Sequence, residues 1–165
     1  MATPETIDAL TQNFPGLATS EFRGESRVVV PREQLFAAMK WLRDVRHFDL
    51  LVDVTCVDYL QYRDAPDRFG LVYLLVHSET NERITLRCYV GEADPTVPSA
   101  VPLWEGAKWL EREVFDMFGI LFDGHPDLRR ILMPEEFLPH PLRKDYPLQG
   151  RGERHNFPVL TRAES

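Results

Sequence analysis

The chain has 165 residues, and its 26 Asp and Glu against 19 Lys and Arg give a formal net charge of −7 and a pI near 5.2. An acidic chain of this kind lacks the clustered basic footprint of a nucleic-acid-binding protein. No run approaches the roughly 18 apolar residues that a transmembrane helix needs. Residues 1–20 have no basic stretch ahead of an apolar one, unlike a secretory signal, so we expect the chain to stay in the cytosol.

The first half of the chain predicts two helices and two strands. Residues 3–13 predict a short helix capped by a threonine, residues 27–30 a strand and residues 31–48 a second helix. That second helix has a clear apolar stripe, made by Leu35, Met39, Leu42 and Val45. Residues 50–59 are β-branched and apolar with intermittent acids, which indicates a strand with one wetter face.

The second half begins with a predicted hairpin. Residues 70–76 form an apolar run, and residues 83–90 alternate polar and apolar side chains after a turn. A proline-spaced connection over residues 91–103 leads to a helix that begins near Trp104. Because two of the strands are hairpin-linked, an all-parallel sheet is excluded, and the order of elements predicts an α+β fold. We expect a two-layer sandwich with helices on one face of a mixed β-sheet, followed by an extended C-terminal arm.

We divide the chain into three parts. Residues 1–119 are the predicted compact α+β domain, residues 120–150 an extended partner-binding arm, and residues 151–165 a poorly ordered or partner-bound tail. Prolines recur through the arm and prevent a continuous helix or central strand. Apolar residues also recur there, and a segment with anchors but no periodicity takes its order from what it contacts.

The helix from residue 104 is the element on which the arm depends. Its predicted core stripe is Ala107, Leu110, Val114 and Met117. Gly119 follows the last helical position and suits the left-handed conformation that ends a helix. Arg112 and Asp116 are four residues apart, so we expect them to pair on the surface.

Two cysteines, Cys56 and Cys88, both lie in apolar strand-like runs and are expected to be buried free thiols. Two cysteines cannot supply the four ligands of an iron–sulfur cluster. The sequence also contains no glycine-rich phosphate loop, so we expect no nucleotide, flavin or NADH site in this chain.

The acidic cluster on the helix is one candidate for chemistry. Glu111 and Glu113 are two apart and point in different directions, so only Glu113 and Asp116 can face one site. A solvated face with an Arg112–Asp116 pair, or charges that hold the following arm, are the structural alternatives. We favour a structural role over general acid–base catalysis, and expect no catalytic residue.

The arm offers two further candidates. His125 and His140, with Glu135 or Glu136 between them, have ligand chemistry but match no metal-site spacing, so we expect structural histidines and no metal site. The basic pairs Arg129–Arg130 and Arg143–Lys144 stand beside Asp127 and Asp145. Mixed charge of this kind favours ion pairs or contacts with a protein partner over phosphate or lipid binding.

Over roughly forty residues the chain resembles a known family signature. The residues that carry the resemblance are Glu111, Arg112, Glu113, Asp116, Phe118, Gly119, Ile120, Gly124, His125, Pro126, Asp127, Leu128, Arg129, Arg130, Ile131, Leu132, His140, Pro141, Leu142, Arg143, Lys144, Asp145, Tyr146, Pro147 and Leu148. Their order and spacing resemble the C (30 kDa-type) subunit of NADH:quinone oxidoreductase, which is respiratory complex I.

The resemblance implies a non-catalytic subunit of a proton-translocating enzyme, placed in its peripheral arm on the cytoplasmic side of the plasma membrane. It implies docking of the C-terminal arm on the neighbouring D (49 kDa-type) subunit near the quinone site, among other peripheral-arm subunits. Flavin, iron–sulfur clusters, NADH and quinone would belong to the complex and not to this chain. The membrane would be reached only through the complex.

Two alternatives remain open from the sequence. The signature is shared in outline with the equivalent subunit of membrane-bound hydrogenases, formate hydrogenlyases and quinone oxidoreductases with another electron donor. A small free-standing enzyme that uses Glu113, Asp116 and His125 is the alternative from a different class, and the helical geometry speaks against it.

Overall fold

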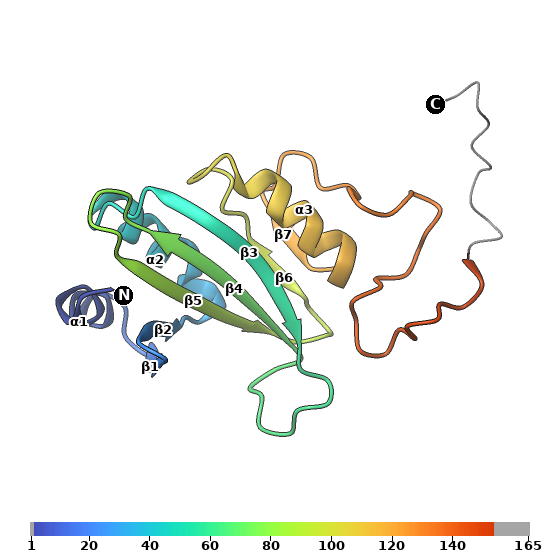
Figure 1. The fold of residues 1–165 in the computed structure, drawn as a ribbon, viewed down its shortest axis with the longest axis horizontal. Helices are drawn as coiled ribbons and strands as arrows, with labels where there is room; N and C mark the ends of the chain where they lie inside the picture. Colours follow the sequence, from blue (N-terminus) through green and yellow to red (C-terminus); the bar gives the residue numbers. More distant parts are fainter. Residues whose placement is uncertain (1, 154–165) are drawn as a thin grey trace.

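The computed structural model describes residues 2–153. The helices and strands, in chain order, are α1 (Pro4–Asn13), β1 (Ala18–Phe22), β2 (Glu25–Val29), α2 (Arg32–Asp44), β3 (Leu50–Asp58), β4 (Phe69–Val76), β5 (Arg83–Val90), β6 (Thr96–Pro98), α3 (Ala107–Phe118) and β7 (Leu121–Asp123). The α+β class and the mixed sheet predicted from the sequence are therefore confirmed (Figure 1).

A five-stranded sheet in the order β1-β2-β5-β4-β3 forms the centre of the described part. Strands β2 and β5 are parallel, and the other neighbours are antiparallel. The predicted β4–β5 hairpin pairs from Phe69 opposite Val90 to Val76 opposite Arg83. Strands β6 and β7 form a separate parallel pair, which brings the connection before α3 alongside the chain that leaves it.

The core lies between one face of this sheet and the helices. Side chains alternate along β3, β4 and β5, and the inward set is almost fully buried: Leu51, Val54, Cys56, Phe69, Leu71, Tyr73, Leu75, Ile84, Leu86, Cys88 and Val90. From α2, Leu35, Met39 and Leu42 are fully buried, as their spacing predicts. In Figure 1, α2 lies behind the strands. Within residues 2–153, no helix covers the opposite face of the sheet.

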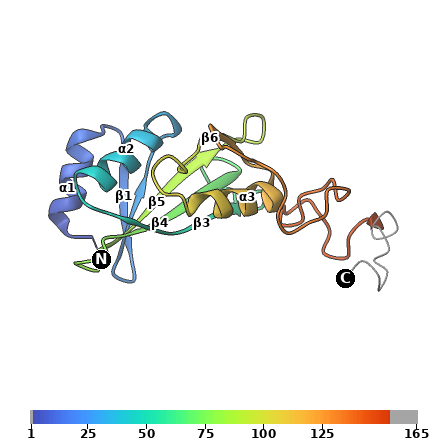
Figure 2. The ribbon, with the colours of Figure 1, turned by 90° about the horizontal axis from the view of Figure 1, so that it is seen from above.

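Local sequence explains where the helices begin and end. Thr3 caps α1 by accepting a hydrogen bond from the Thr6 amide. Helix α3 ends at Gly119, which has φ +76, a conformation that glycine adopts without strain. The chain then turns back along α3, and in both Figure 1 and Figure 2 the arm extends beyond the end of α3, away from α1.

Several expectations from the sequence are wrong in detail. Strands β1, β6 and β7 were not predicted, because β1 is exposed along its whole length and the other two have three residues each. Val45 lies just after the end of α2 and is exposed, so it does not belong to the apolar stripe. The predicted wetter face of β3 is confirmed as an exposed face, although its exposed side chains include the apolar Leu50 and Val52. Leu110 on α3 is only partly buried.

The boundaries predicted for the three parts of the chain stay a prediction. Residues 121–123 form β7, and residues 124–150 contain no further helix or strand. The prediction of a poorly ordered or partner-bound tail over 151–165 lies, from residue 154 onward, outside the described residues.

Candidate functional site: the arm anchored on helix α3

Asp116 is the centre of the contacts between α3 and the arm. Its Oδ2 accepts hydrogen bonds from the backbone amides of Ile131, Leu132 and Met133 at 2.7–3.0 Å. Its Oδ1 pairs with Arg130 at 2.6 Å. Burial alone would raise the pKa of Asp116, but the three amides and the guanidinium outweigh burial and lower it. The buried carboxylate therefore stays charged and holds one turn of the arm.

Two arginines complete this junction from opposite sides. Arg112 is buried on α3 and donates to the backbone carbonyls of Arg129 and Arg130 at 3.0 and 2.9 Å. Arg130 in turn donates to the carbonyls of Leu138 and Pro139 at 2.7 and 3.1 Å. The expected surface pair between Arg112 and Asp116 is therefore wrong: both side chains are buried and each binds the arm instead.

The end of α3 lies in close contact with the later part of the arm. The Leu142 amide donates to the carbonyl of Met117, and Arg143 Nε donates to that of Phe118 at 2.6 Å. His140 Nδ1 lies 2.9 Å from the Asp116 carbonyl. A Cβ on Gly119 would lie 2.5 Å from His140 Nε2 and 2.6 Å from an Arg143 nitrogen. Glycine is thus required here for the close approach as well as for its positive φ.

A second anchor ties the arm to the end of the sheet. Arg68 lies between three carboxylates, Asp58 at 3.1 Å, Glu92 at 2.6 Å and Asp145 of the arm at 2.9 Å. Asp58 is buried at the end of β3 and also accepts from the Lys144 amide at 2.9 Å. Burial would raise the pKa of Asp58, but Arg68 and the amides lower it. This network joins residues 86 positions apart, and no local pattern in the sequence indicates it.

The histidines bind backbone, as their turn-like context predicts. His125 Nε2 lies 3.1 Å from the Lys108 carbonyl, and its Nδ1 accepts from the Asp127 amide at 3.0 Å. Burial lowers the pKa of His140, and the nearby Arg143 and Arg130 act in the same direction. Both imidazoles therefore help to fix the arm on α3.

The remaining signature residues have mixed positions. Tyr146 packs edge-on against the buried Phe137 with ring centroids 5.9 Å apart. Leu128 packs partly against the core. Arg129 pairs with Asp127 at the surface. Glu113, Pro126, Lys144 and Asp145 have exposed side chains, and Pro141 is half-buried.

Glu111 faces away from the arm and into the core. Its carboxylate accepts from Ser99 Oγ at 2.7 Å and from the Ala100 amide at 2.6 Å, so it holds the turn that follows β6. Burial raises its pKa from 4.5 to about 7, against the lowering effect of these two hydrogen bonds. Sequence reasoning placed Glu111 correctly away from Glu113 and Asp116 but missed Ser99, because no spacing rule links the two.

The geometry does not assemble Glu113, Asp116 and His125 into a catalytic site. The Asp116 carboxylate already accepts from three amides and an arginine, both ring nitrogens of His125 bind backbone, and Glu113 points to solvent. A general base needs free access to the proton that it removes. The hypothesis of a small enzyme built on these residues is therefore not supported.

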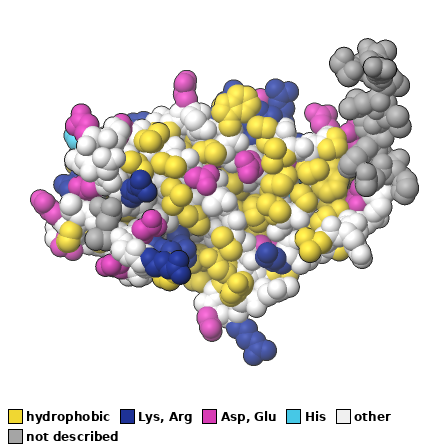
Figure 3. Space-filling view, viewed as in Figure 1, with side chains coloured by type: hydrophobic (Ala, Val, Ile, Leu, Met, Phe, Trp, Pro, Cys, Tyr) yellow, Lys and Arg dark blue, Asp and Glu magenta, His cyan; other side chains and the backbone are white. Residues whose placement is uncertain are grey.

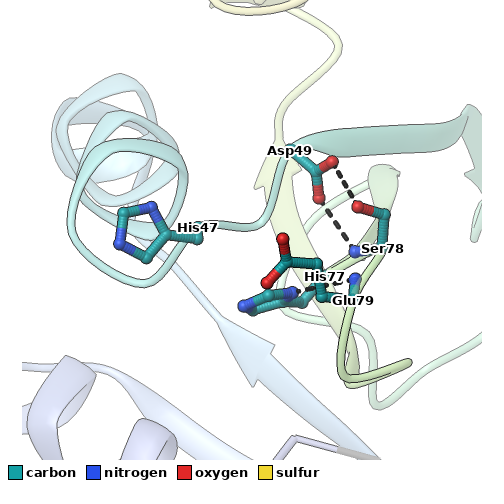
Figure 4. A pocket seen from close by; sticks show the side chains of 5 residues that line it. All are labelled: His47, Asp49, His77, Ser78 and Glu79. Carbon is teal, nitrogen blue, oxygen red and sulfur yellow. Dashed lines mark hydrogen bonds between the residues drawn. The ribbon is translucent and has the colours of Figure 1, made fainter.

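A polar hollow lies at the end of β4, where residues that the sequence did not single out meet (Figure 4). Asp49 accepts from the amide and the hydroxyl of Ser78 at 2.9 and 2.6 Å, and the His47 and His77 rings lie 6.3 Å apart. Within residues 2–153, no group of three or more His, Cys, Asp or Glu side chains is arranged to hold a metal ion. We assign no function to this hollow.

The arm exposes four leucines among its polar side chains. Leu132, Leu138 and Leu142 have exposed fractions of 59, 81 and 51 %, and Leu148 is fully exposed. We call these four leucines the outer arm surface. The backbones of Leu132, Leu138 and Leu142 are held by the contacts described above, so these three side chains project from an anchored segment. Fold and site together define a small α+β protein whose arm is fixed on its own domain and exposes apolar side chains, a feature typical of subunits of larger assemblies.

Comparison with known proteins agrees with this class. The sequence profile of the family described as "Respiratory-chain NADH dehydrogenase, 30 Kd subunit" matches residues 28–152. The chain belongs to this family, and it is a subunit of a multi-subunit respiratory complex, NADH-quinone oxidoreductase. The resemblance seen in the sequence is thereby confirmed.

Individual relatives give the same result. The C subunit of NADH-quinone oxidoreductase from Trichlorobacter lovleyi is 49 % identical over 152 residues, covering 91 % of this chain and 93 % of the relative. Subunit 5 of the Thermus thermophilus enzyme is 47 % identical over 131 residues, covering 76 % of this chain and 63 % of the relative.

Solved structures extend the comparison to the fold. A trypsin-resistant fragment of Nqo5 (1-134) superposes with a TM-score of 0.69 at 37 % identity, covering 75 % of this chain and 97 % of the fragment. A chain of an archaeal membrane-bound sulfane sulfur reductase superposes with a TM-score of 0.76 at 21 % identity, covering 96 % of this chain and 92 % of the reductase chain. At that identity the second match establishes the fold alone. No helix among residues 2–153 is both long and apolar enough to cross a membrane.

Proposed function

We propose that this chain is a structural and assembly subunit of a proton-translocating NADH:quinone oxidoreductase and carries no redox centre of its own. Its outer arm surface docks on the D (49 kDa-type) subunit near the quinone site, on the cytoplasmic side of the plasma membrane. Flavin, iron–sulfur clusters, NADH and quinone are bound by other subunits, and this chain reaches the membrane only through the complex.

The observation that carries the proposal is an apolar surface on an arm that the domain itself holds in place. Arm segments at 131–133 and 142–144 are hydrogen-bonded to Asp116, Met117 and Asp58. The leucines between and beside these anchors face outward. An arm that is already ordered loses less conformational entropy on docking, so a modest apolar surface can give stable binding.

The chemistry of the cysteines supports a role without electron transfer. Cys56 and Cys88 are buried free thiols, and burial raises the pKa of each to about 12. Metal and cluster ligation needs the thiolate form, which is suppressed at such a pKa. An iron–sulfur cluster also needs four ligands, and residues 2–153 contain no metal-binding group of three or more candidate side chains.

An enzyme with a different electron donor is the second candidate. The fold is shared with a chain of a sulfane sulfur reductase complex over almost its whole length, so the fold does not select NADH as the donor. The identity of 47–49 % to NADH-quinone oxidoreductase subunits favours the NADH:quinone enzyme.

The test is affinity purification of the tagged chain from detergent-solubilised membranes, with partners quantified by mass spectrometry. We expect a double variant, Leu138→Glu with Leu142→Glu, to reduce recovery of the D-type subunit by about tenfold or more, because charges replace apolar contacts. Val45→Glu, at an exposed valine after α2, is the matched control and should recover the same subunits as wild type.

The outcomes test the outer arm surface and also distinguish the NADH:quinone enzyme from an enzyme with another electron donor. Undiminished recovery of the D-type subunit by the double variant would contradict docking through the outer arm surface. Recovery of a large subunit by the wild type without NADH-binding flavoprotein subunits would replace the NADH:quinone enzyme with the other-donor alternative.

A further inference from the structure

The face of the sheet opposite α2 and α3 is apolar, yet no helix of the described part covers it. On β3 the outward side chains include Leu50 and Val52, each 49 % exposed, and Val57. Beside them on β4 lie Val72, Leu74 and Val76, which are half-buried. Figure 3 views this side of the molecule and shows hydrophobic side chains gathered over the sheet. We call this surface the open sheet face.

A groove of about 380 Å³ runs across this face. The residues that line it include Leu50, Val52, Leu74, Val76, Arg83 and Thr85, from β3, β4 and β5. The antiparallel register places Leu50 opposite Val76, so the apolar wall is continuous across two strands. A hollowed apolar patch of this kind on an edge of the core is typical of a protein-binding surface.

Arginines border the groove on its β5 side. The register sets Arg27 of β2 beside Thr85 of β5, and Arg83, Thr85 and Arg87 follow each other along the outer side of β5. Among the residues that the structure describes, none of Arg27, Arg83 and Arg87 forms an ion pair. The Nε atom of Arg87 is buried and has no hydrogen-bond partner there. Arg27 stacks on Phe22 at 4.3 Å.

This row of unpaired arginines is unusual in a chain with a net charge of −7. The acids on the same face include Glu25, which lines the groove, and Asp53 at the irregularity of β3. Arg83 is exposed and has no acidic partner among the described residues, so its guanidinium is free to form a charge-assisted contact with a carboxylate. The face is therefore complementary to a ligand that carries both carboxylates and apolar side chains.

We propose that the open sheet face binds an acidic amphipathic segment of a neighbouring subunit of the complex. Leucine-like side chains of that segment occupy the groove beside Leu50 and Val52, and its carboxylates pair with Arg83 and Arg87. This interface is separate from the outer arm surface and does not depend on where the arm docks.

Site-specific cross-linking in the assembled complex tests the proposal. A photoreactive amino acid replaces the exposed Val52 in the full chain, and the same amino acid at Val45 serves as control. We expect the Val52 probe to form a cross-link to one peptide of another subunit that has Asp or Glu beside apolar residues. A cross-link to lipid, to a second copy of this chain or to a non-acidic peptide, or no cross-link at all, would overturn the proposal.

A charge variant tests the ionic half of the interface. Arg83→Glu lies at an exposed side chain, and Arg63→Glu, at an exposed arginine in the β3–β4 connection, is the matched control. We expect Arg83→Glu to reduce the Val52 cross-link by about fivefold and to weaken its dependence on added salt, with no effect of Arg63→Glu. An unchanged cross-link in Arg83→Glu would exclude the arginine contact.

The two interfaces can be separated in the same experiment. If the Leu138→Glu and Leu142→Glu variant loses the D-type subunit but keeps the Val52 cross-link, both proposals hold independently. If Arg83→Glu lowers the cross-link while the arm variant loses no subunit, the open sheet face stands and the arm proposal fails.

Discussion

The arm junction and the open sheet face use the same residue types in opposite ways. In the junction, Arg112 and Arg130 bind carbonyls of the arm, and Asp116 binds its amides. On the open sheet face, Arg83 and Arg87 have no ion pair within residues 2–153, and Leu50 and Val52 remain exposed. The recognisable signature therefore mostly serves the internal anchoring of the arm. The surfaces that we propose for partners lie on the outer side of the arm, where Leu132, Leu142 and Leu148 also belong to the signature, and on the sheet, which lies outside it.

The difference follows from burial. A buried charge is costly unless hydrogen bonds and an opposite charge surround it, so each charged residue of the junction requires several defined partners. An exposed leucine or arginine has no such requirement before a partner binds. The charged residues of the junction thus depend on more partners within the chain than the exposed residues of the outer arm surface and the open sheet face do.

The largest effect is expected from Asp116→Ala. It leaves three arm amides and the largely buried Arg130 without their shared acceptor, which should cost about 3–5 kcal/mol of unfolding free energy. Urea denaturation of the full chain measures this loss. Glu113→Ala, on the exposed side of the same helix, is the control and should change the free energy by under about 0.5 kcal/mol. Equal losses in the two variants would mean that the junction contributes nothing specific.

Glu111 should make stability depend on pH. Its pKa is about 7 in the folded chain against an ordinary 4.5, so the folded state binds the proton more tightly. Stability therefore falls as pH rises from about 4.5 to about 7 and changes no further above that range. Glu111→Gln removes this contribution, which is at most about 3 kcal/mol.

The comparison of variant and wild type isolates Glu111. The lowered pKa of His140 acts in the opposite sense and is present in both chains. We expect Glu111→Gln to gain stability relative to wild type as pH rises through the range, by urea denaturation at several pH values, and Glu105→Gln at an exposed carboxyl to show no such trend. A constant difference across pH would contradict the raised pKa.

Gly119→Ala tests the close approach between α3 and the arm. The positive φ and the contact of a Cβ with His140 and Arg143 should together cost about 2 kcal/mol. Gly106→Ala is the matched control, since a Cβ there meets no atom within 4 Å and the φ is −59. Measured by thermal denaturation, the Tm should be lower than that of wild type for Gly119→Ala and unchanged for Gly106→Ala. A decrease of similar size in both variants would refute the packing argument.

The smallest effect on stability is expected from Asp145→Ala. Its carboxylate pairs with Arg68 at 2.9 Å but is half-exposed, and Arg68 keeps Asp58 and Glu92. The loss should stay under about 1 kcal/mol. Arg143→Ala should cost more, because Arg143 Nε binds the Phe118 carbonyl and its guanidinium lies 5.1 Å from the Phe69 ring. Urea denaturation measures both losses of unfolding free energy. A larger loss for Asp145→Ala than for Arg143→Ala would contradict the view that Arg143 is the stronger of the two anchors.

The periodicity of apolar residues was sufficient to predict the helix and strands that form the core. The alternation along residues 50–59 and 83–90 and the stripe on residues 31–48 predicted β3, β5 and α2, because each element buries one face. Strand β1 has no buried side chain, so no hydrophobic pattern could reveal it. The short β6 and β7 depend on each other's backbone and leave no pattern either.

The site was predictable as a set of residues but not as a set of contacts. The spacing of Arg112 and Asp116 suggested a local pair, yet the reversal of the chain after Gly119 brings arm amides and carbonyls within reach, and burial favours these partners. The roles of Ser99, Asp58 and Arg68 were missed because their partners Glu111, Lys144 and Asp145 come from other elements. Contacts of that range are set by the fold.

Hydrogen–deuterium exchange of the isolated full chain tests the central claim most directly, namely that the domain itself orders the arm. We predict that the amides of Ile131, Leu132, Met133 and Leu142 are protected in the isolated wild type, and that protection at 131–133 is lost in Asp116→Ala. If these amides exchange at unprotected rates in the isolated wild type and become protected only in the assembled complex, the arm is ordered by its partner, and the account is contradicted.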